Sequence, residues 1–147
     1  MPFHHDVTVA WGDCDEAGIV FYPNYFYWLD SAFQALLRAH GLSQRSLRTR
    51  FGALGTPIAE AGAKFLGPVT YEDVLRLEVR IERWGRRSFR VAYRGFKDGE
   101  LVLEGFEARI WAVPTESGRL TSAEIPAAFR AALSRAPGDV PPARTVC

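Results

Sequence analysis

Residues 11–25, WGDCDEAGIVFYPNY, bring together residue types that could act on a carbonyl group. Two carboxylates, Asp13 and Asp15, stand on a turn rich in small residues, and Pro23 follows within a few positions. Proline suits the first residue of a helix, because the N–H that it lacks would have no partner there. A carboxylate on a turn that runs into a helix N-terminus can face one reacting carbonyl together with an electrophilic hydrogen-bond donor. This segment is therefore the first candidate for an active site.

A long helix is predicted directly after this turn, from Pro23 to His40. Gly41 is a suitable stop at its C-terminus. Apolar residues recur at steps of three and four, and Phe26 and Ala35 widen the apolar arc, which is typical of a helix buried on more than one side. The residues of the apolar stripe are Tyr25, Trp28, Leu29, Ala32, Phe33, Leu36 and Leu37.

Strand patterns dominate the rest of the chain. The clearest alternation lies in 74–84, where apolar residues alternate with charged ones. Asp98-Gly99 suits a type I′ hairpin turn, and Gly105 is interpreted as the mark of a bulge. Residues 42–56 are expected to hold a short helix or a loop. The predicted strands are 7–11, 57–66, 74–84, 88–96 and 101–113, with a short helix near Pro126–Leu133.

These elements predict an α+β fold, with one strand, one long buried helix and four further strands joined by hairpins. A five-stranded antiparallel sheet wrapped around a long central helix is the hotdog arrangement. Sheet edges in such a fold are commonly paired between subunits, which removes exposed strand edges. We therefore expect a homodimer or a homotetramer.

The bulk properties predict one domain and exclude several classes of partner. The chain of 147 residues fits a single domain, expected at 1–133, and its tail at 134–147 is rich in proline and alanine and is predicted to be disordered. The 18 basic and 17 acidic side chains give a net charge of +1, which argues against a nucleic-acid binder. The sequence has no apolar run long enough to span a membrane and no evident signal peptide, so a cytoplasmic location is expected. Cys14 and Cys147 form no disulfide framework.

Four segments carry a resemblance to a known family: WGDCDEAGIVFYPNYFYWLD at 11–30, GTPI at 55–58, TYEDVL at 70–75 and ERWGRRSF at 82–89. Together they resemble the signature of the 4-hydroxybenzoyl-CoA thioesterase branch of the hotdog superfamily, from Val7 to Pro126. The resemblance implies an acyl-CoA thioesterase that needs no metal and no cofactor, since coenzyme A is part of its substrate. It does not define the acyl group, which could be aromatic, such as a hydroxybenzoyl group, or of short to medium length.

The resemblance implies a catalytic role for Asp15, which would either attack the thioester carbonyl or activate water. No histidine stands in the motif, which slightly favours the nucleophile. By the same match, the helix that begins near Tyr22 and Pro23 aims a backbone N–H at the carbonyl oxygen. Tyr22 is the expected donor, because Pro23 has no N–H, and a few kcal/mol of oxyanion stabilisation is typical of one such donor.

Three further residues are candidates for substrate binding by the same resemblance. Asp30 matches a position that helps to recognise a ring hydroxyl, and the alternatives are a helix-surface carboxylate or a hydrogen bond between subunits. Arg86 and Arg87, on the tight turn Gly85-Arg86-Arg87, match a basic turn that meets the phosphates of coenzyme A. The family pattern has three basic residues there, so one charge is missing in this chain. The alternative is a solvated hairpin tip.

Other polar residues near these motifs receive structural interpretations. Asp13 could raise the pKa of Asp15, but a cap on the loop is the favoured role. Glu60 is interpreted as structural or as lining the site, and Cys14 as a small buried filler. His4 and His5 have no spaced partners, and no metal is assigned to them.

Two rival functions remain open. One is a thioesterase acting on acyl-carrier-protein thioesters, which would need a basic docking surface larger than two arginines. The other is a non-catalytic hotdog module that binds coenzyme A or only assembles. The presence of Asp15 argues against the second, because a degenerate site has no reason to keep a carboxylate there.

Overall fold

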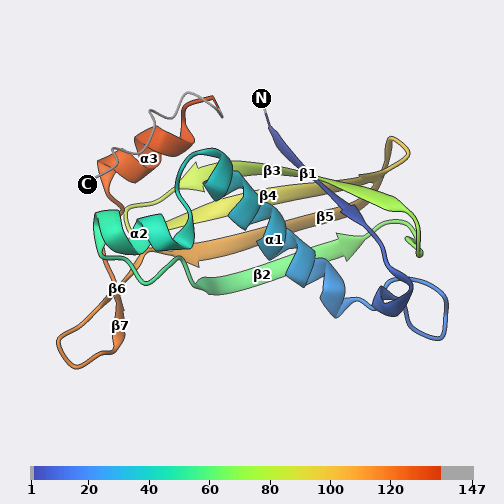
Figure 1. Ribbon diagram of the computed structural model, residues 1–147, viewed down its shortest axis with the longest axis horizontal. Coiled ribbons are helices and arrows are strands. Elements are labelled where there is room, and N and C mark those ends of the chain that lie inside the picture. Colours follow the sequence, from blue (N-terminus) through green and yellow to red (C-terminus); the bar gives the residue numbers. More distant parts are fainter. Residues whose placement is uncertain (1, 137–147) are drawn as a thin grey trace, which may run out of the picture.

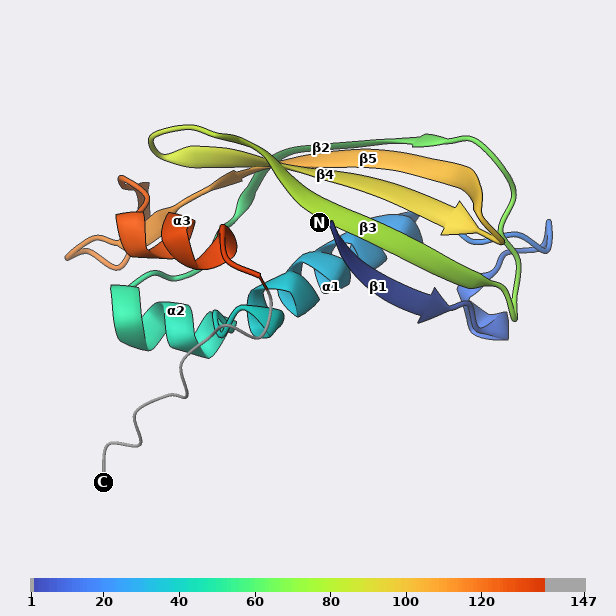
Figure 2. The ribbon, with the colours of Figure 1, turned by 90° about the horizontal axis from the view of Figure 1, so that it is seen from above.

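A five-stranded antiparallel sheet forms the body of the protein, and one long helix crosses one of its faces (Figure 1, Figure 2). The computed structural model describes residues 2–136. The strand order is β1-β3-β4-β5-β2, so β1 and β2 form the two edges, and β6 pairs with β7 in a separate ribbon. The elements are β1 (Phe3–Thr8), a 3₁₀ turn (Trp11–Asp13), α1 (Pro23–Ala39), α2 (Gln44–Phe51), β2 (Ile58–Phe65), β3 (Val74–Trp84), β4 (Ser88–Lys97), β5 (Glu100–Ile110), β6 (Ala112–Pro114), β7 (Leu120–Ser122) and α3 (Ala127–Leu133).

The core lies between α1 and the sheet. The apolar stripe predicted for 23–40 is buried along α1, and Leu29, Phe33 and Leu37 are completely enclosed. Across from them, β3 contributes Leu75 and Leu77, which are also fully buried. Burial of each such side chain stabilises the fold by about 1.5–3 kcal/mol. The α+β architecture with a five-stranded antiparallel sheet is therefore confirmed, and the short helix near Pro126–Leu133 is α3.

The first strand lies earlier in the chain than predicted. The prediction of a strand at 7–11 is wrong, because β1 ends at Thr8 and Trp11–Asp13 forms a 3₁₀ turn. Thr8 stands opposite Val74, the first residue of β3, and beyond it Val9 bonds only to Glu72 and Asp73 in the loop before β3. The alternation of burial in β1 begins at Phe3, but polar residues at four of its six positions hide the strand from a search for apolar runs.

The predicted single strand at 101–113 is two strands. β5 ends at Ile110, which stands opposite Ser88, the first residue of β4, and the chain then leaves the sheet to form β6. Trp111 lies at the break, is buried, and packs its ring 4.8 Å from that of Phe129 on α3. β5 therefore ends where its antiparallel neighbour β4 begins.

Gly105 does not mark a bulge, contrary to the sequence interpretation. It pairs regularly with Ala63 and Tyr93, and the irregularity between β4 and β5 lies at Gly95. A Cβ added at Gly105 would lie 3.0 Å from Cδ1 of Leu29 on α1. The missing side chain therefore allows the helix to approach the sheet closely.

β2 is an open edge strand whose residues are mostly exposed. Phe65 at its end faces α1 and contacts Tyr25, with ring centroids 5.1 Å apart, yet 48% of its surface remains exposed. Within residues 2–136, no helix is long and apolar enough to cross a membrane. The tail predicted at 134–147 lies outside the described residues from position 137 onward.

Candidate active site

Asp15 stands on an exposed turn between the 3₁₀ turn and α1. The two arms of this turn pair with each other: Cys14 forms a bridge with Val20, and the N–H of Asp15 donates to the carbonyl of Ile19 at 3.1 Å. Oδ1 of Asp15 accepts a hydrogen bond from the N–H of Ala17 at 2.9 Å. Within residues 2–136, no donor contacts Oδ2. One carboxylate oxygen thus orients the side chain and the other is open to a substrate.

The N-terminus of α1 lies beside the same paired arms. The N–H of Phe21 donates to the carbonyl of Asp13 at 2.9 Å, and Pro23 opens the helix with no N–H of its own. The N–H of Tyr22 has no acceptor within the described part of the chain. Asp15 stands two residues beyond Asp13 on the same arm, next to the bridge between Cys14 and Val20. A free donor at a helix N-terminus and a carboxylate are therefore held on one small scaffold.

Asp13 has the structural role that was favoured for it. Its Oδ2 accepts a hydrogen bond from the N–H of Ala10 at 2.8 Å, and its carbonyl accepts one from Nδ2 of Asn24, also at 2.8 Å. These bonds tie the 3₁₀ turn to the first turn of α1. The nearby Cys14 is half-buried, with Sγ 3.9 Å from the carbonyl of Ala10.

The loop 66–73 contacts the turn of Asp15 and stabilises it through hydrogen bonds. The N–H of Val20 donates to the carbonyl of Val69 at 2.9 Å, and Oγ1 of Thr70 donates to the carbonyl of Gly18 at 2.5 Å. Asp73 closes this loop by accepting from the N–H of Thr70 and by pairing with Lys97, and both contacts lower the pKa of Asp73. The segment TYEDVL, which supported the family resemblance, therefore has a physical role in holding the turn of Asp15.

Thr70→Val should weaken this support. Loss of the hydroxyl removes one partly buried hydrogen bond, so we expect a loss of about 1 kcal/mol in the free energy of unfolding. A looser turn should also lower kcat several-fold for the thioester hydrolysis that the sequence resemblance implies. Urea unfolding and steady-state kinetics measure the two effects, and Thr121→Val, at an exposed position of β7, is the matched control. Wild-type values for both quantities in Thr70→Val would contradict this role.

Large aromatic side chains are exposed around the turn. The rings of Trp11 and Tyr71 meet edge to face at 4.8 Å, and those of Phe21 and Tyr22 at 5.8 Å. Trp11 is 76% exposed and Tyr27, one turn into α1, is 73% exposed. Exposed apolar patches commonly bind a ligand or another protein surface. The surroundings of Asp15 therefore suit an apolar ligand or a second subunit.

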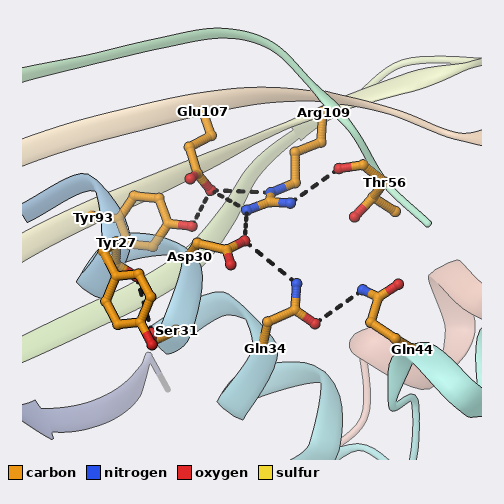
Figure 3. A network of polar contacts seen from close by, with 9 residues as sticks. All are labelled: Tyr27, Asp30, Ser31, Gln34, Gln44, Thr56, Tyr93, Glu107 and Arg109. Carbon is orange, nitrogen blue, oxygen red and sulfur yellow. Dashed lines mark hydrogen bonds and ion pairs between the residues drawn. The ribbon is translucent and has the colours of Figure 1, made fainter. Parts of the chain in front are cut away.

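Asp30 belongs to a polar network that the sequence analysis did not detect (Figure 3). Its Oδ1 lies 2.8 Å from Nη2 of Arg109, a residue of β5 that is only 3% exposed. Arg109 also donates to Oε1 of Glu107, at 3.0 Å through Nε and 2.9 Å through Nη2, and Tyr93 donates its hydroxyl to the same oxygen. Its Nη1 donates to the carbonyl of Thr56 at 3.0 Å. The helix-surface interpretation of Asp30 is thus too simple, because a buried cation holds it.

The ionisation of this network follows from its burial. Burial raises the pKa of Glu107, although Arg109 and the Tyr93 hydroxyl act in the opposite direction. Burial alone would lower the pKa of Arg109, but the neighbouring Glu107 carboxylate raises it overall. Burial also raises the pKa of Tyr93, and Glu107 adds to the effect. Arg109 is therefore a cation at neutral pH, and Tyr93 is a neutral donor.

The strand pattern contained a signal for this pair. In β5 the odd-numbered positions face α1, as the buried Leu103 and the contact of Gly105 with Leu29 indicate. Glu107 and Arg109 share this inward parity. Two charged residues at inward positions of a strand indicate a buried, paired group, because an unpaired charge there would be costly.

Arg86 and Arg87 lie at the opposite end of the sheet from Asp15. β3 begins beside the loop that supports Asp15 and ends at Trp84, about 33 Å further along. Figure 1 shows the two ends of β3 on opposite sides of the molecule. Both arginines are exposed, and Arg86 pairs loosely with Glu124 at 3.5 Å. One chain therefore does not bring these arginines to its own Asp15.

Two other candidates lie apart from the turn. Glu60 is exposed on β2. His4 lies 3.6 Å from Glu78 across the β1–β3 pair. Neither residue contacts the network around Asp30.

Comparison with known proteins places these features in a family. The sequence model of the thioesterase-like superfamily matches residues 9–133. The 4-hydroxybenzoyl-CoA thioesterase of Pseudomonas sp. strain CBS-3 is 36% identical over 127 residues, which cover 82% of this chain and 89% of that protein. A solved structure of the Pseudomonas thioesterase superposes with a TM-score of 0.80 at 34% identity, covering 89% of this chain and 98% of the other.

Two further similarities involve other aromatic thioesters. A 1,4-dihydroxy-2-naphthoyl-CoA hydrolase of Picosynechococcus sp. is 28% identical over 100 residues, 68% of each chain. The structure of a gentisyl-coenzyme A thioesterase gives a TM-score of 0.77 at 32% identity, covering 87% of this chain and 99% of the other. The names of these relatives all describe cleavage of the thioester of a hydroxylated aromatic acid.

Proposed function

Because the chain belongs to the thioesterase-like superfamily, we propose that it hydrolyses an aromatic acyl-CoA to the free acid and coenzyme A. The relationship to 4-hydroxybenzoyl-CoA thioesterase that the motifs predicted is confirmed by the sequence identity and by the structural superposition. The observation that carries the proposal is the turn of Asp15, where an open carboxylate oxygen lies on the same paired arms as the free N–H of Tyr22.

These two groups can perform the reaction without a metal. The thioester carbonyl oxygen would accept the N–H of Tyr22, where the partial positive charge of the helix N-terminus also acts. Asp15 would then attack the carbonyl carbon, the C–S bond would break, and coenzyme A would leave as a thiolate. Water would cleave the resulting anhydride, release the acid and restore Asp15. The alternative is that Asp15 removes a proton from water, which attacks directly.

Heavy-oxygen water distinguishes the two routes. In a single turnover, the anhydride route transfers label into Asp15 when water attacks the aspartyl carbonyl. The general-base route puts label only into the product acid. Mass spectrometry of the peptide that contains Asp15 reads the outcome directly.

The acyl group would lie along the exposed face of α1. Asp30 stands about two helical turns beyond Tyr22, a rise of about 12 Å. This separation suits one aromatic ring with a hydrogen bond at each end, to the N–H of Tyr22 and to Asp30. The relatives named for hydroxylated aromatic thioesters support the same substrate class. We therefore favour a hydroxybenzoyl-like group over an aliphatic chain.

A second copy of the chain would complete the site. The open edge β2 offers unpaired backbone groups to another β2, and its residues are mostly exposed in one chain. If the two β2 strands pair antiparallel, the strands of the partner run in the opposite direction. The end of one sheet that carries Arg86 and Arg87 then lies near the end of the other sheet that carries Asp15. Arg86 and Arg87 of one protomer would then serve coenzyme A bound in the other, as a dimer or within a tetramer. Sedimentation equilibrium measures the assembly, and a monomer at micromolar concentration would contradict it.

Replacing both arginines, Arg86→Ala/Arg87→Ala, should raise KM for an aryl-CoA about tenfold, with kcat changed less than about twofold. The physical reason is loss of charge-assisted contacts to phosphate. The matched control is Arg119→Ala, at an exposed cation on the β6–β7 hairpin. The same aryl thioester of pantetheine, which lacks the nucleotide phosphates, should show no change in KM. An unchanged KM for the CoA ester would rule out the phosphate contact.

Initial rates of thiol release on a panel of thioesters test the proposed function. The panel comprises benzoyl-, 4-hydroxybenzoyl-, phenylacetyl- and aliphatic CoA esters, with the matching acyl-carrier-protein thioesters. We expect the hydroxylated benzoyl ester of coenzyme A to be the best substrate. Faster turnover of the carrier-protein thioesters would favour the rival esterase, and turnover of none would favour a binding module.

A further inference from the structure

The Asp30 carboxylate rests on a rigid, buried support. We propose that Arg109 is a positioning residue that fixes this carboxylate as an acceptor for a hydroxyl group on the acyl moiety. The inference rests on the proposed function and goes beyond it, because it assigns the choice between hydroxylated and plain acyl groups to a residue that does not itself meet the substrate.

The guanidinium of Arg109 is constrained on every side. Its three nitrogens donate to Glu107, to the Thr56 carbonyl and to Asp30, at distances between 2.8 and 3.0 Å. One face stacks on the ring of Phe33, with Cζ 4.1 Å from the ring centroid. A planar fork held in this way cannot rotate without breaking several contacts. Arg109 therefore presents Nη2 to α1 in one fixed direction.

This direction determines how Asp30 can act. Oδ1 is occupied by Arg109 and lies 3.5 Å from Nε2 of Gln34. Within residues 2–136, no donor contacts Oδ2, and 49% of the side chain is exposed. An ionised carboxylate only accepts hydrogen bonds. The free Oδ2 of Asp30 can therefore accept a hydrogen bond from a hydroxyl group on the ring. It can form no such bond with a ring that carries hydrogen or a methoxy group at that position.

A purely structural role explains less of the geometry. Packing alone would not favour the burial of Glu107, Arg109 and Tyr93, since an apolar core of similar volume is often at least as stable. If the network served only to neutralise the buried Glu107 and Arg109, it would not need a third, half-exposed carboxylate. Asp30 is such a carboxylate, and it lies on the face of α1 where Tyr27 and Gln34 are also accessible (Figure 3).

The test uses a variant that removes both buried charges, Glu107→Gln/Arg109→Gln. Paired replacement avoids an isolated buried charge, so the protein should fold. The readout is the ratio of kcat/KM for 4-hydroxybenzoyl-CoA to that for benzoyl-CoA, which a general loss of stability would not change. We expect a ratio of about ten or more in the wild type and a ratio below about two in this variant and in Asp30→Asn. The variant with all three substitutions should show no further loss.

The matched control is Glu78→Gln/Arg94→Gln, the same substitutions in an ion pair 2.6 Å apart between β3 and β4. Its ratio should equal that of the wild type. A folded Glu107→Gln/Arg109→Gln protein with the wild-type ratio would overturn the inference. If that protein does not fold, Arg109→Lys is the deciding variant. Its single ammonium group should stay with Glu107 and release Asp30, so the ratio of kcat/KM for the two esters should fall. An unchanged ratio would overturn the inference.

The outcomes for the inference and for the proposed function are separable. A wild type that hydrolyses both esters at equal kcat/KM would refute the role of Arg109 and leave the thioesterase function intact. A wild type that hydrolyses neither ester would refute the proposed function itself.

Discussion

Asp15→Asn is expected to lower kcat for an aromatic acyl-CoA by a factor of about 10³. The amide has the shape of the carboxylate, and its oxygen can still accept the N–H of Ala17, so the turn should persist. It can neither attack the carbonyl as an anion nor remove a proton from water. KM should change little, because the contacts proposed for coenzyme A involve Arg86 and Arg87 and not Asp15. Steady-state thiol release with a thiol-reactive dye measures both constants.

Glu16→Gln is the matched control for this change, since Glu16 is an exposed carboxylate directly beside Asp15. It should keep wild-type kcat. Circular dichroism and thermal unfolding verify that both variants fold alike. An Asp15→Asn protein that retains a tenth or more of the wild-type kcat would remove Asp15 from the chemistry.

Arg109→Ala is expected to lower the free energy of unfolding by about 3–5 kcal/mol. The truncation leaves Glu107 only 2% exposed with the Tyr93 hydroxyl as its remaining partner, and it leaves the Thr56 carbonyl without its donor. It also opens a space beside Phe33. Urea unfolding at pH 8 gives the value, and the Glu107→Gln/Arg109→Gln variant should lose much less.

The same loss should shrink as the pH falls. Burial already raises the pKa of Glu107 above its ordinary 4.5, and removal of Arg109 raises it further. A carboxyl with a raised folded pKa favours the folded state below its unfolded pKa, and this contribution is lost as pH rises through the folded pKa. Arg109→Ala should therefore be less destabilising near pH 4 than at pH 8. A loss below about 1 kcal/mol, or one independent of pH, would show that Glu107 does not depend on Arg109.

The long periodic segments α1 and β3 were predictable from the sequence, but the ends of β1 and β5 were not. The stripe of α1 and the alternation of β3 extend over many residues, so they define those elements closely. The ends of β1 and β5 depend instead on where the neighbouring strand begins, as Val74 and Ser88 show. Pairing of this kind is tertiary and leaves no local mark.

The candidate site divides in the same way. Asp15, Tyr22 and Pro23 are neighbours in sequence, so one motif was enough to bring them together. Arg109 reaches Asp30 from a distant strand, and only its inward parity in β5 hinted at a buried role. The separation of Arg86 and Arg87 from Asp15 depends on where the two ends of the sheet lie. No sequence pattern within the turn contains this information.

Thiol release from 4-hydroxybenzoyl-CoA by the wild-type protein tests the central claim most directly. We predict saturable hydrolysis with kcat/KM of about 10⁴ M⁻¹s⁻¹ or higher, as is typical of an enzyme on its own substrate class. Thiol release at the rate of buffer alone, from a folded protein, would contradict it.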